Sequence, residues 1–390
     1  MIKDLKVKKL QGIVRLRMSN PFTIGIVQTE DEFCNRKEER EELNRFAQNG
    51  SKVLIYSPRR FGKSSLVTLV LKDLRKKGFL TAYVDLFPVT SEHDFVVRVA
   101  SAVFKGFGQD VSPKSLIEKI KGIFSSIRPI IEVSPEGYSI SAKYDPISRS
   151  QMPLDDLMEG LYNYVKKMKL PACIALDEFQ EITELPEVKR IEGTLRSHIQ
   201  FQKEISYFYI GSRRRILQDM FNNRARPFYK SASSYELKPI AKDHFVPFIE
   251  KRFSETGKFC SKVVAEDIYV AADGYPYYVQ KLAAIVWDIT EKESSKELVK
   301  QALTLLIKSE AVDFEGQWGS LSLSQRALLK AIACESTPSP YSKEFLVRHD
   351  LSVGGAQKAL KILIAKDFIE KSADGFYKLT DPIMVAWLKL

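Results

Sequence analysis

Short apolar runs alternate with helical patterns between residues 20 and 240. Five of these runs are rich in β-branched and aromatic residues, which predicts strands. The segments between them place apolar residues at helical spacing. Strand, loop, helix and strand in succession form a βαβ unit, so we predict an α/β domain with a parallel sheet. The predicted strands are KVLIYS (52–57), LTAYVDLF (80–87), ACIALDE (172–178), ISYFYIGS (205–212) and SYELKPI (234–240).

Other patterns predict further elements. Two alternating stretches flank Pro135-Glu136-Gly137, which is typical of a β-hairpin inserted into the domain. After Pro239 the pattern is helical, and from Ser322 three helical segments precede two short strands, the order of a winged helix. We therefore predict a basic extension (1–19), an α/β core (20–240) with a hairpin at about 127–145, a helical region (241–317) and a winged helix (318–390).

Composition is that of a globular protein. Of the 390 residues, 44% are hydrophobic and 11% aromatic, and no apolar run is long enough to span a membrane. The first residues are basic without an apolar segment, so we expect no secretory signal and a cytoplasmic location. The four cysteines are far apart, so neither a disulfide framework nor a metal site of cysteines is expected.

The net charge of +11 bears on partners. It is compatible with nucleic acid or an anionic surface, and it is equally compatible with a basic protein that binds neither. Charge alone leaves the partner open.

SPRRFGKSS is the strongest chemical motif in the chain, and it lies between a predicted strand and a predicted helix. It matches the second half of the phosphate-binding loop G-x-x-x-x-G-K-[ST], with Ser57 at the usual first glycine. Backbone amides of such a loop and of the helix start converge on phosphate oxygens. Lys63 is then expected to reach the β- and γ-phosphates and Ser64 to bind Mg²⁺. The predicted nucleotide-binding residues are Ser57, Pro58, Arg59, Arg60, Phe61, Gly62, Lys63, Ser64 and Ser65.

A second motif lies about 115 residues further along, where the apolar strand ACIALDE ends in Asp177 and Glu178. Ligands bind at the carboxyl ends of parallel strands. We predict that Asp177 binds Mg²⁺ together with Ser64, and that Glu178 activates the water that attacks the γ-phosphate. The sequence therefore predicts an ATPase that uses ATP and Mg²⁺.

Polar residues also follow the strand at 205–212. Ser212 is a candidate contact to the γ-phosphate, and Arg213 is a candidate for stabilising transferred-phosphate charge. A turn serine and a solvated helix start are the alternatives. Arg224 and Arg226 are candidates for a finger that acts on a neighbouring subunit's nucleotide, although a solvated surface arginine is the favoured interpretation of each.

The ordered motifs NPF, FCNRKEEREEL, SPRRFGKSSL, LDEFQE, YIGSRRRIL, YELKPI and GYPYYVQKLA resemble the archaeal-type ATPases, AAA+-like P-loop proteins related to the STAND class. The resemblance covers about residues 20–390. It implies a sheet with the loop strand central and the Asp177-Glu178 strand beside it. It also implies that the helical region forms a lid (about 241–315) and that a winged helix follows.

The resemblance also implies roles for single residues. Phe33 and Arg36 match an entrance segment that packs near the base, Ser212 matches a sensor position, and Asp85 matches an aspartate of the second strand. Gly274-Tyr275-Pro276 matches the lid motif, which adds Pro276 to the nucleotide site. Two departures are Cys34-Asn35 in place of a glycine-containing pair, and the lack of the lid arginine that many relatives have, with Lys281 the nearest cation. They point to slow hydrolysis, with the nucleotide acting as a switch.

The C-terminal domain leaves two functions open. Gln357, Lys358 and Lys361 lie on one face of the helix at 352–366, and Lys371 and Lys378 lie in the predicted wing, which suits DNA. Lysines also keep a helix solvated, and protein docking is the other interpretation. We predict an ATP-driven conformational switch acting on a macromolecular partner, self-association included, with ATP-dependent DNA binding as the alternative.

Overall fold

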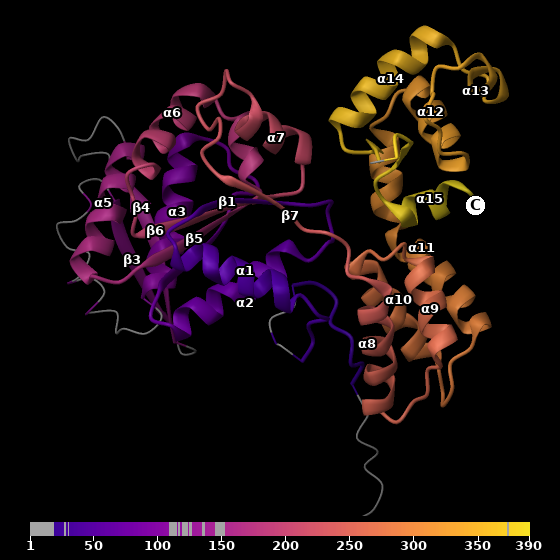
Figure 1. The fold of residues 1–390 in the computed structure, drawn as a ribbon, viewed down its shortest axis with the longest axis horizontal. Helices are drawn as coiled ribbons and strands as arrows, with labels where there is room; N and C mark the ends of the chain where they lie inside the picture. The colour runs from indigo at the N-terminus through magenta and orange to yellow at the C-terminus, as the bar shows by residue number, and fades with distance from the viewer. Residues whose placement is uncertain are drawn as a thin grey trace, which may run out of the picture.

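A computed structural model describes residues 19–26, 29, 31–108, 115, 118, 124, 127–134, 137–144, 153–372 and 374–390. The predicted extension (1–19) lies outside the described residues except for Ser19. Figure 1 shows an α/β core, a helical lid beside it and a winged helix at the C-terminal end. No helix in the described part of the chain is long and apolar enough to cross a membrane.

The core is built on a five-stranded parallel sheet, as predicted. Its strands are β1 (Lys52–Tyr56), β2 (Leu80–Asp85), β5 (Ala172–Asp177), β6 (Ile205–Gly211) and β7 (Ser233–Glu236). They lie in the order β2-β5-β6-β1-β7, and every neighbouring pair is parallel.

The expectation that β5 lies beside a central β1 is wrong. β6 lies between the loop strand β1 and the carboxylate strand β5, and the middle strand of the sheet is β6 rather than β1. β5 and β6 are both buried along their whole length. Their continuous apolar runs therefore predict interior strands but do not determine which strand pairs with β1. The inserted strand brings Ser212 between the loop and the carboxylates.

Helices cover both faces of the sheet. Val53 and Ile55 of β1 pack against α1 (Lys37–Gln48) and α2 (Lys63–Lys76), and Leu54 between them faces the opposite core. This alternation follows from the two-residue period of a strand. The opposite core contains α3 (Glu92–Phe107), α5 (Pro153–Met168), α6 (Val188–Ile199) and α7 (Arg214–Asn222). The two cores hold the strand ends, and therefore the site, in place.

The inserted hairpin is confirmed. β3 (Ile127–Ser134) pairs with β4 (Gly137–Tyr144) in antiparallel register. It packs on α3, where the Ala142 backbone N–H donates to Ser101 Oγ over 2.8 Å. It lies away from the carboxyl ends of β1, β5 and β6 (Figure 1).

The lid and the winged helix share one hydrophobic core. α11 runs from Lys296 to Gly319, and the ring of its buried Phe314 packs against Trp387. The lid helices are α8 (Lys242–Glu255), α9 (Lys262–Ala271), α10 (Pro276–Ile289) and α11. The winged helix contains α12 (Leu323–Cys334), α13 (Lys343–Arg348), α14 (Val353–Ala365), β8 (Ile369–Lys371), β9 (Tyr377–Leu379) and α15 (Pro382–Leu388).

α15 was not predicted, although its start carries a recognisable signal. Asp381 Oδ1 accepts the backbone N–H groups of Ile383 and Met384 over 2.9 and 3.1 Å, and Pro382 occupies the first helical position. Asp-Pro before an apolar run is a helix start. This cap places Asp381 beside the nucleotide loop.

Candidate functional site

The loop between β1 and α2 has the conformation that an anion site requires. Gly62 is the N-cap of α2 and has a φ of 83°, a left-handed conformation that favours glycine. Because glycine has no side chain, it leaves the first amides of α2 uncapped. These amides and the helix dipole both favour a phosphate there.

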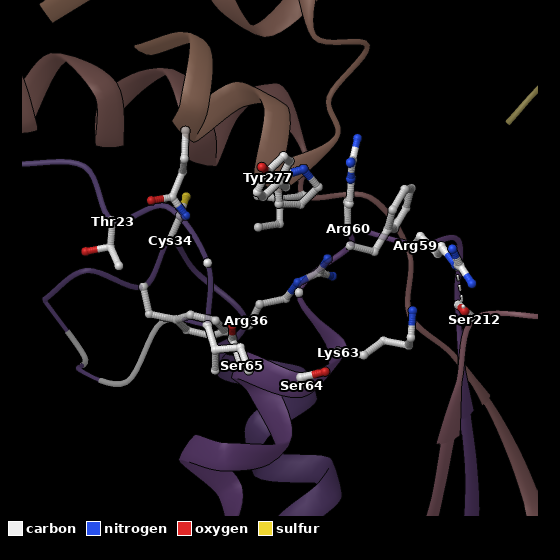
Figure 2. Close-up of a pocket in the computed structure, with 18 of the residues that line it drawn as sticks. Thr23, Cys34, Arg36, Arg59, Arg60, Lys63, Ser64, Ser65, Ser212 and Tyr277 are labelled. Carbon is white, nitrogen blue, oxygen red and sulfur yellow. Dashed lines mark hydrogen bonds between the residues drawn. The ribbon is translucent and has the colours of Figure 1, made fainter. Parts of the chain in front are cut away.

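A cavity of about 230 Å³ opens at this loop (Figure 2). Its walls come from the N-terminal segment, the loop, the ends of β5 and β6, and lid helix α10. It is lined by Thr23, Gly25, Ile26, Phe33, Cys34, Arg36, Arg59, Arg60, Phe61, Gly62, Lys63, Ser64, Ser65, Glu178, Ser212, Ile240, Pro276, Tyr277 and Gln280. The structure thus brings most of the predicted nucleotide-binding residues into one cavity.

Lys63 is buried and turned back onto its own loop. Its Nζ donates to the carbonyl oxygens of Ser57 and Pro58 over 3.0 and 2.9 Å. Burial lowers the pKa of Lys63 to about 8, although the Glu178 and Asp177 carboxylates act in the opposite direction. Ser57 and Pro58 lie outside the cavity lining and hold the lysine instead.

Asp177 lies at the end of β5 and is linked to the loop. Ser64 Oγ donates to Asp177 Oδ2 over 2.7 Å, and the Tyr83 hydroxyl of β2 donates to the same oxygen. A hydroxyl and a carboxylate beside a phosphate site are ligands that Mg²⁺ accepts, with waters and phosphate oxygens completing its shell. Among the described residues, no group of three or more His, Cys, Asp or Glu side chains gathers as a metal site.

Glu178 faces the cavity from a left-handed backbone conformation, with φ of 50°. Ser212 Oγ, at the end of β6, donates to Glu178 Oε2 over 3.1 Å, and the Gln180 amide donates to the same oxygen. Arg59 Nε donates to Ser212 Oγ over 3.4 Å. Ser212 therefore connects the loop to the carboxylate, and Figure 2 shows its hydrogen bond with Arg59.

Two cavity residues carry buried polar atoms without a partner in the described part of the chain. These atoms are Nη2 of Arg36 and Oε1 of Gln280. Burying an unpaired polar atom is costly, so a ligand that pairs with both atoms recovers that cost. Arg36 also pairs with Glu39 over 2.7 Å, which holds its guanidinium in place.

Comparisons with known proteins agree with this geometry. Residues 33–282 match the family described as an ATPase domain predominantly from Archaea, and residues 312–390 match a probable winged helix domain. The chain belongs to this archaeal ATPase family. A Methanocaldococcus jannaschii protein, MJECL04, is 24% identical over 375 residues, covering 92% of this chain and 68% of its own length.

Two solved structures share the fold of this member of the family. The Walker-type ATPase PABY2304 of Pyrococcus abyssi superposes with a TM-score of 0.70 at 18% identity, covering 95% of this chain and 100% of its own. The ORC2 protein of Aeropyrum pernix, solved with ADPNP and ADP, superposes with a TM-score of 0.60 at 16% identity, covering 94% and 97%. At these identities the likeness establishes the fold alone.

The three candidate arginines that follow β6, Arg213, Arg224 and Arg226, lie outside the cavity lining. Arg213 pairs with Glu181 and Glu184 over 3.7 and 3.5 Å. Arg226 pairs with the buried Glu192, whereas Arg224 is exposed. Asp85 accepts the backbone N–H of Phe87 over 2.9 Å at the end of β2. These contacts account for Arg213, Arg226 and Asp85 without a nucleotide.

The lid supplies residues that sequence reasoning missed. Tyr277 and Gln280 line the cavity beside the predicted Pro276, and Thr23, Gly25 and Ile26 close it from the N-terminal segment. Gly25 has a φ of 119°. The glycine in the sequence Thr-Ile-Gly-Ile was the feature that could have indicated this part of the cavity. Lys281 pairs with the buried Glu310 over 2.5 Å and is absent from the cavity lining.

Proposed function

We propose that this ATPase-family chain binds Mg-ATP, hydrolyses it to ADP and phosphate, and uses the nucleotide as a conformational switch towards a macromolecular partner. One observation carries the proposal. A phosphate-binding loop and the Glu178 carboxylate face the same cavity, with Lys63 and the Ser64–Asp177 pair beside them. The decisive experiment is a calorimetric titration with Mg-ATP, combined with a phosphate-release assay.

Each group has a chemical task in this proposal. The amides at the start of α2 hold the β-phosphate, and Lys63 leaves the Ser57 and Pro58 carbonyls to bind the β- and γ-phosphates. Ser64 and Asp177 hold Mg²⁺, which neutralises phosphate charge and orients the phosphates when bound. Tyr83 fixes the orientation of Asp177 through its hydrogen bond.

Glu178 is the proposed base. It accepts the proton of a water aligned with the γ-phosphate, and Ser212 holds its carboxylate in position. Arg59 is held by Ser212 at the cavity and stabilises charge on the transferred group. Arg36 and Gln280, with their unpaired atoms, bind the nucleoside end or a phosphate oxygen.

The affinity for Mg-ATP is expected to fall as the pH rises above about 8. Lys63 has a pKa of about 8 in the free chain, and a phosphate partner raises it. Binding above that pH requires uptake of a proton, so affinity should weaken by up to about tenfold per pH unit until the pKa of the complex is reached. Below pH 8 Lys63 is already protonated in the free chain, so its effect on the affinity no longer changes with pH. Calorimetry at pH 7, 8 and 9 measures it.

Lys63→Arg is the matched control for the pH prediction. Arginine remains protonated over this range, so the affinity of the variant should depend much less on pH. An equal decline in both proteins would assign the pH dependence to another group.

DNA binding by the winged helix is the second candidate. Gln357, Lys358 and Lys361 form an exposed face of α14, on the helix that enters the major groove in winged helices. Lys358→Gln with Lys361→Gln in the full chain should then reduce the salt slope of duplex binding by about 2, since each phosphate contact contributes roughly 0.9. Binding by the wild-type chain that does not respond to salt would argue against DNA as the partner.

A further inference from the structure

Arg60 of the nucleotide loop is bound to two other parts of the chain. Its Nη2 donates to Glu310 of lid helix α11 over 2.9 Å, and its Nη1 donates to Asp381 of the winged helix over 3.2 Å. Its guanidinium also lies over the rings of Tyr277 and Tyr278, 4.9 and 4.8 Å from their centroids. Figure 2 shows the Arg60 side chain pointing away from Lys63 and Ser64, on the side of Tyr277.

The same edge of the winged helix meets other core arginines. Glu370 of β8 pairs with Arg214 of α7, and Lys378 of β9 supports Glu370 over 3.6 Å. Burial raises the pKa of Asp367, while the positive charges of Arg213, Arg59, Arg214 and Arg215 act in the opposite direction. We call Asp367, Glu370 and Asp381 the acidic edge. It faces the arginines that surround the phosphate-binding loop.

Aromatic residues of the lid add further contacts between the loop and the winged helix. Phe61 of the loop packs edge-on against Tyr275, with ring centroids 4.7 Å apart. The Tyr275 hydroxyl donates to the Thr380 carbonyl over 2.7 Å, and the Tyr278 hydroxyl donates to Asp381 Oδ2 over 2.6 Å. The loop, the lid and the start of α15 are therefore joined by direct contacts.

We propose that the acidic edge competes with nucleotide phosphates for the arginines around the loop, so that nucleotide binding undocks the winged helix. This inference rests on the proposed ATP binding. Arg59 and Arg60 line the cavity, and Arg214 is close enough to Lys63 to lower its pKa. The carboxylates of Glu370 and Asp381 pair with two of these arginines.

The expected direction of the movement, undocking when the nucleotide binds, follows from charge. A bound triphosphate places negative charge beside the acidic edge and attracts the same guanidinium groups, so each docking pair weakens as the nucleotide enters. The coupling is reciprocal, because an effector that favours one state is bound more tightly by that state. Removing the charges of the acidic edge should therefore free the winged helix and strengthen nucleotide binding.

The position of the winged helix is measurable in the full chain. Cys334 is exposed in α12, whereas Cys34, Cys173 and Cys260 are buried, so a spin label reacts selectively at Cys334. A second label is placed on exposed Lys189 of α6 by Lys189→Cys. Pulsed electron paramagnetic resonance then measures the distance with and without a non-hydrolysable ATP analogue and Mg²⁺. The analogue is expected to shift or broaden the distance distribution.

Asp381→Asn combined with Glu370→Gln tests the acidic edge itself. Asparagine caps a helix as well as aspartate does, so α15 is retained. The double variant should show the undocked distance without nucleotide and bind the analogue roughly 5- to 10-fold more tightly, at the lower end of typical couplings. Glu335→Gln is the control, since Glu335 pairs with Arg348 of its own domain. It should leave both distance and affinity unchanged.

The outcomes separate the two proposals. Calorimetric binding of the analogue without any change in the distance would overturn the undocking and leave the ATP site standing. A double variant with wild-type distance and affinity would also overturn it. Absence of binding in the wild-type chain would overturn the proposed function, and the inference with it.

Discussion

Glu178→Gln is expected to retain Mg-ATP binding and to slow hydrolysis by about 10²-fold or more, the usual contribution of a general base. The amide has the shape of the carboxylate and still accepts the hydrogen bond from Ser212. It does not accept a proton from water. Phosphate release at saturating ATP measures the chemical step, and calorimetry measures the affinity.

Glu184→Gln is the control for this variant. Glu184 follows Glu178 by one 3₁₀ segment, is largely exposed and pairs only weakly with Arg213 over 3.5 Å. It should hydrolyse ATP at the wild-type rate. Undiminished turnover by the Glu178→Gln protein would remove the base from its assigned role, whatever the affinity.

Lys63→Ala is expected to lose Mg-ATP affinity by about two orders of magnitude or more. Truncating one partner of a buried charge pair costs roughly 2–5 kcal/mol, and each 1.4 kcal/mol is about tenfold in affinity. The variant lacks the Lys63 ammonium group, which we propose contacts the phosphates from the start of α2. Calorimetric titration measures the loss directly.

A fold check accompanies the lysine variant, because Lys63 is buried and donates to two carbonyls of its own loop. Circular dichroism melting separates a lost contact from a lost fold. Lys76→Ala, at the exposed far end of the same helix, is the matched control and should bind normally. Wild-type affinity in a folded Lys63→Ala protein would contradict the assigned phosphate contact.

The nucleotide loop is predictable because its determinants are local. A β-branched strand, Gly62 in the left-handed region, and Lys63-Ser64 at the first turn of a helix lie within a few residues of one another. Phosphate binding by this loop depends on the conformation of its backbone, which the local sequence already indicates. The parallel sheet and the order of the winged helix follow for the same reason, since both were predicted from periodicity and turn residues.

Contacts between distant segments were less predictable. The family resemblance implied that β5 lies beside β1, and the structure places β6 between them, because strand pairing depends on how two equally buried apolar runs pack. Arg213, a candidate for the phosphates, pairs with Glu181 and Glu184, which the sequence did not indicate. The neighbouring Ser212 donates to the Glu178 carboxylate, so two adjacent residues at the end of β6 contact different carboxylates.

By itself the sequence determined the phosphate loop, the carboxylates at the end of an apolar strand, the hairpin and the order of the domains, since each depends on spacing over a few residues. Tertiary structure alone decided that Tyr277 and Gln280 of the lid, and residues 23–26 of the N-terminal segment, complete the cavity. It also decided that Arg60 meets Glu310 and Asp381, which lie 250 and 321 residues further along. Such partners are chosen by packing and burial, and no local pattern encodes them.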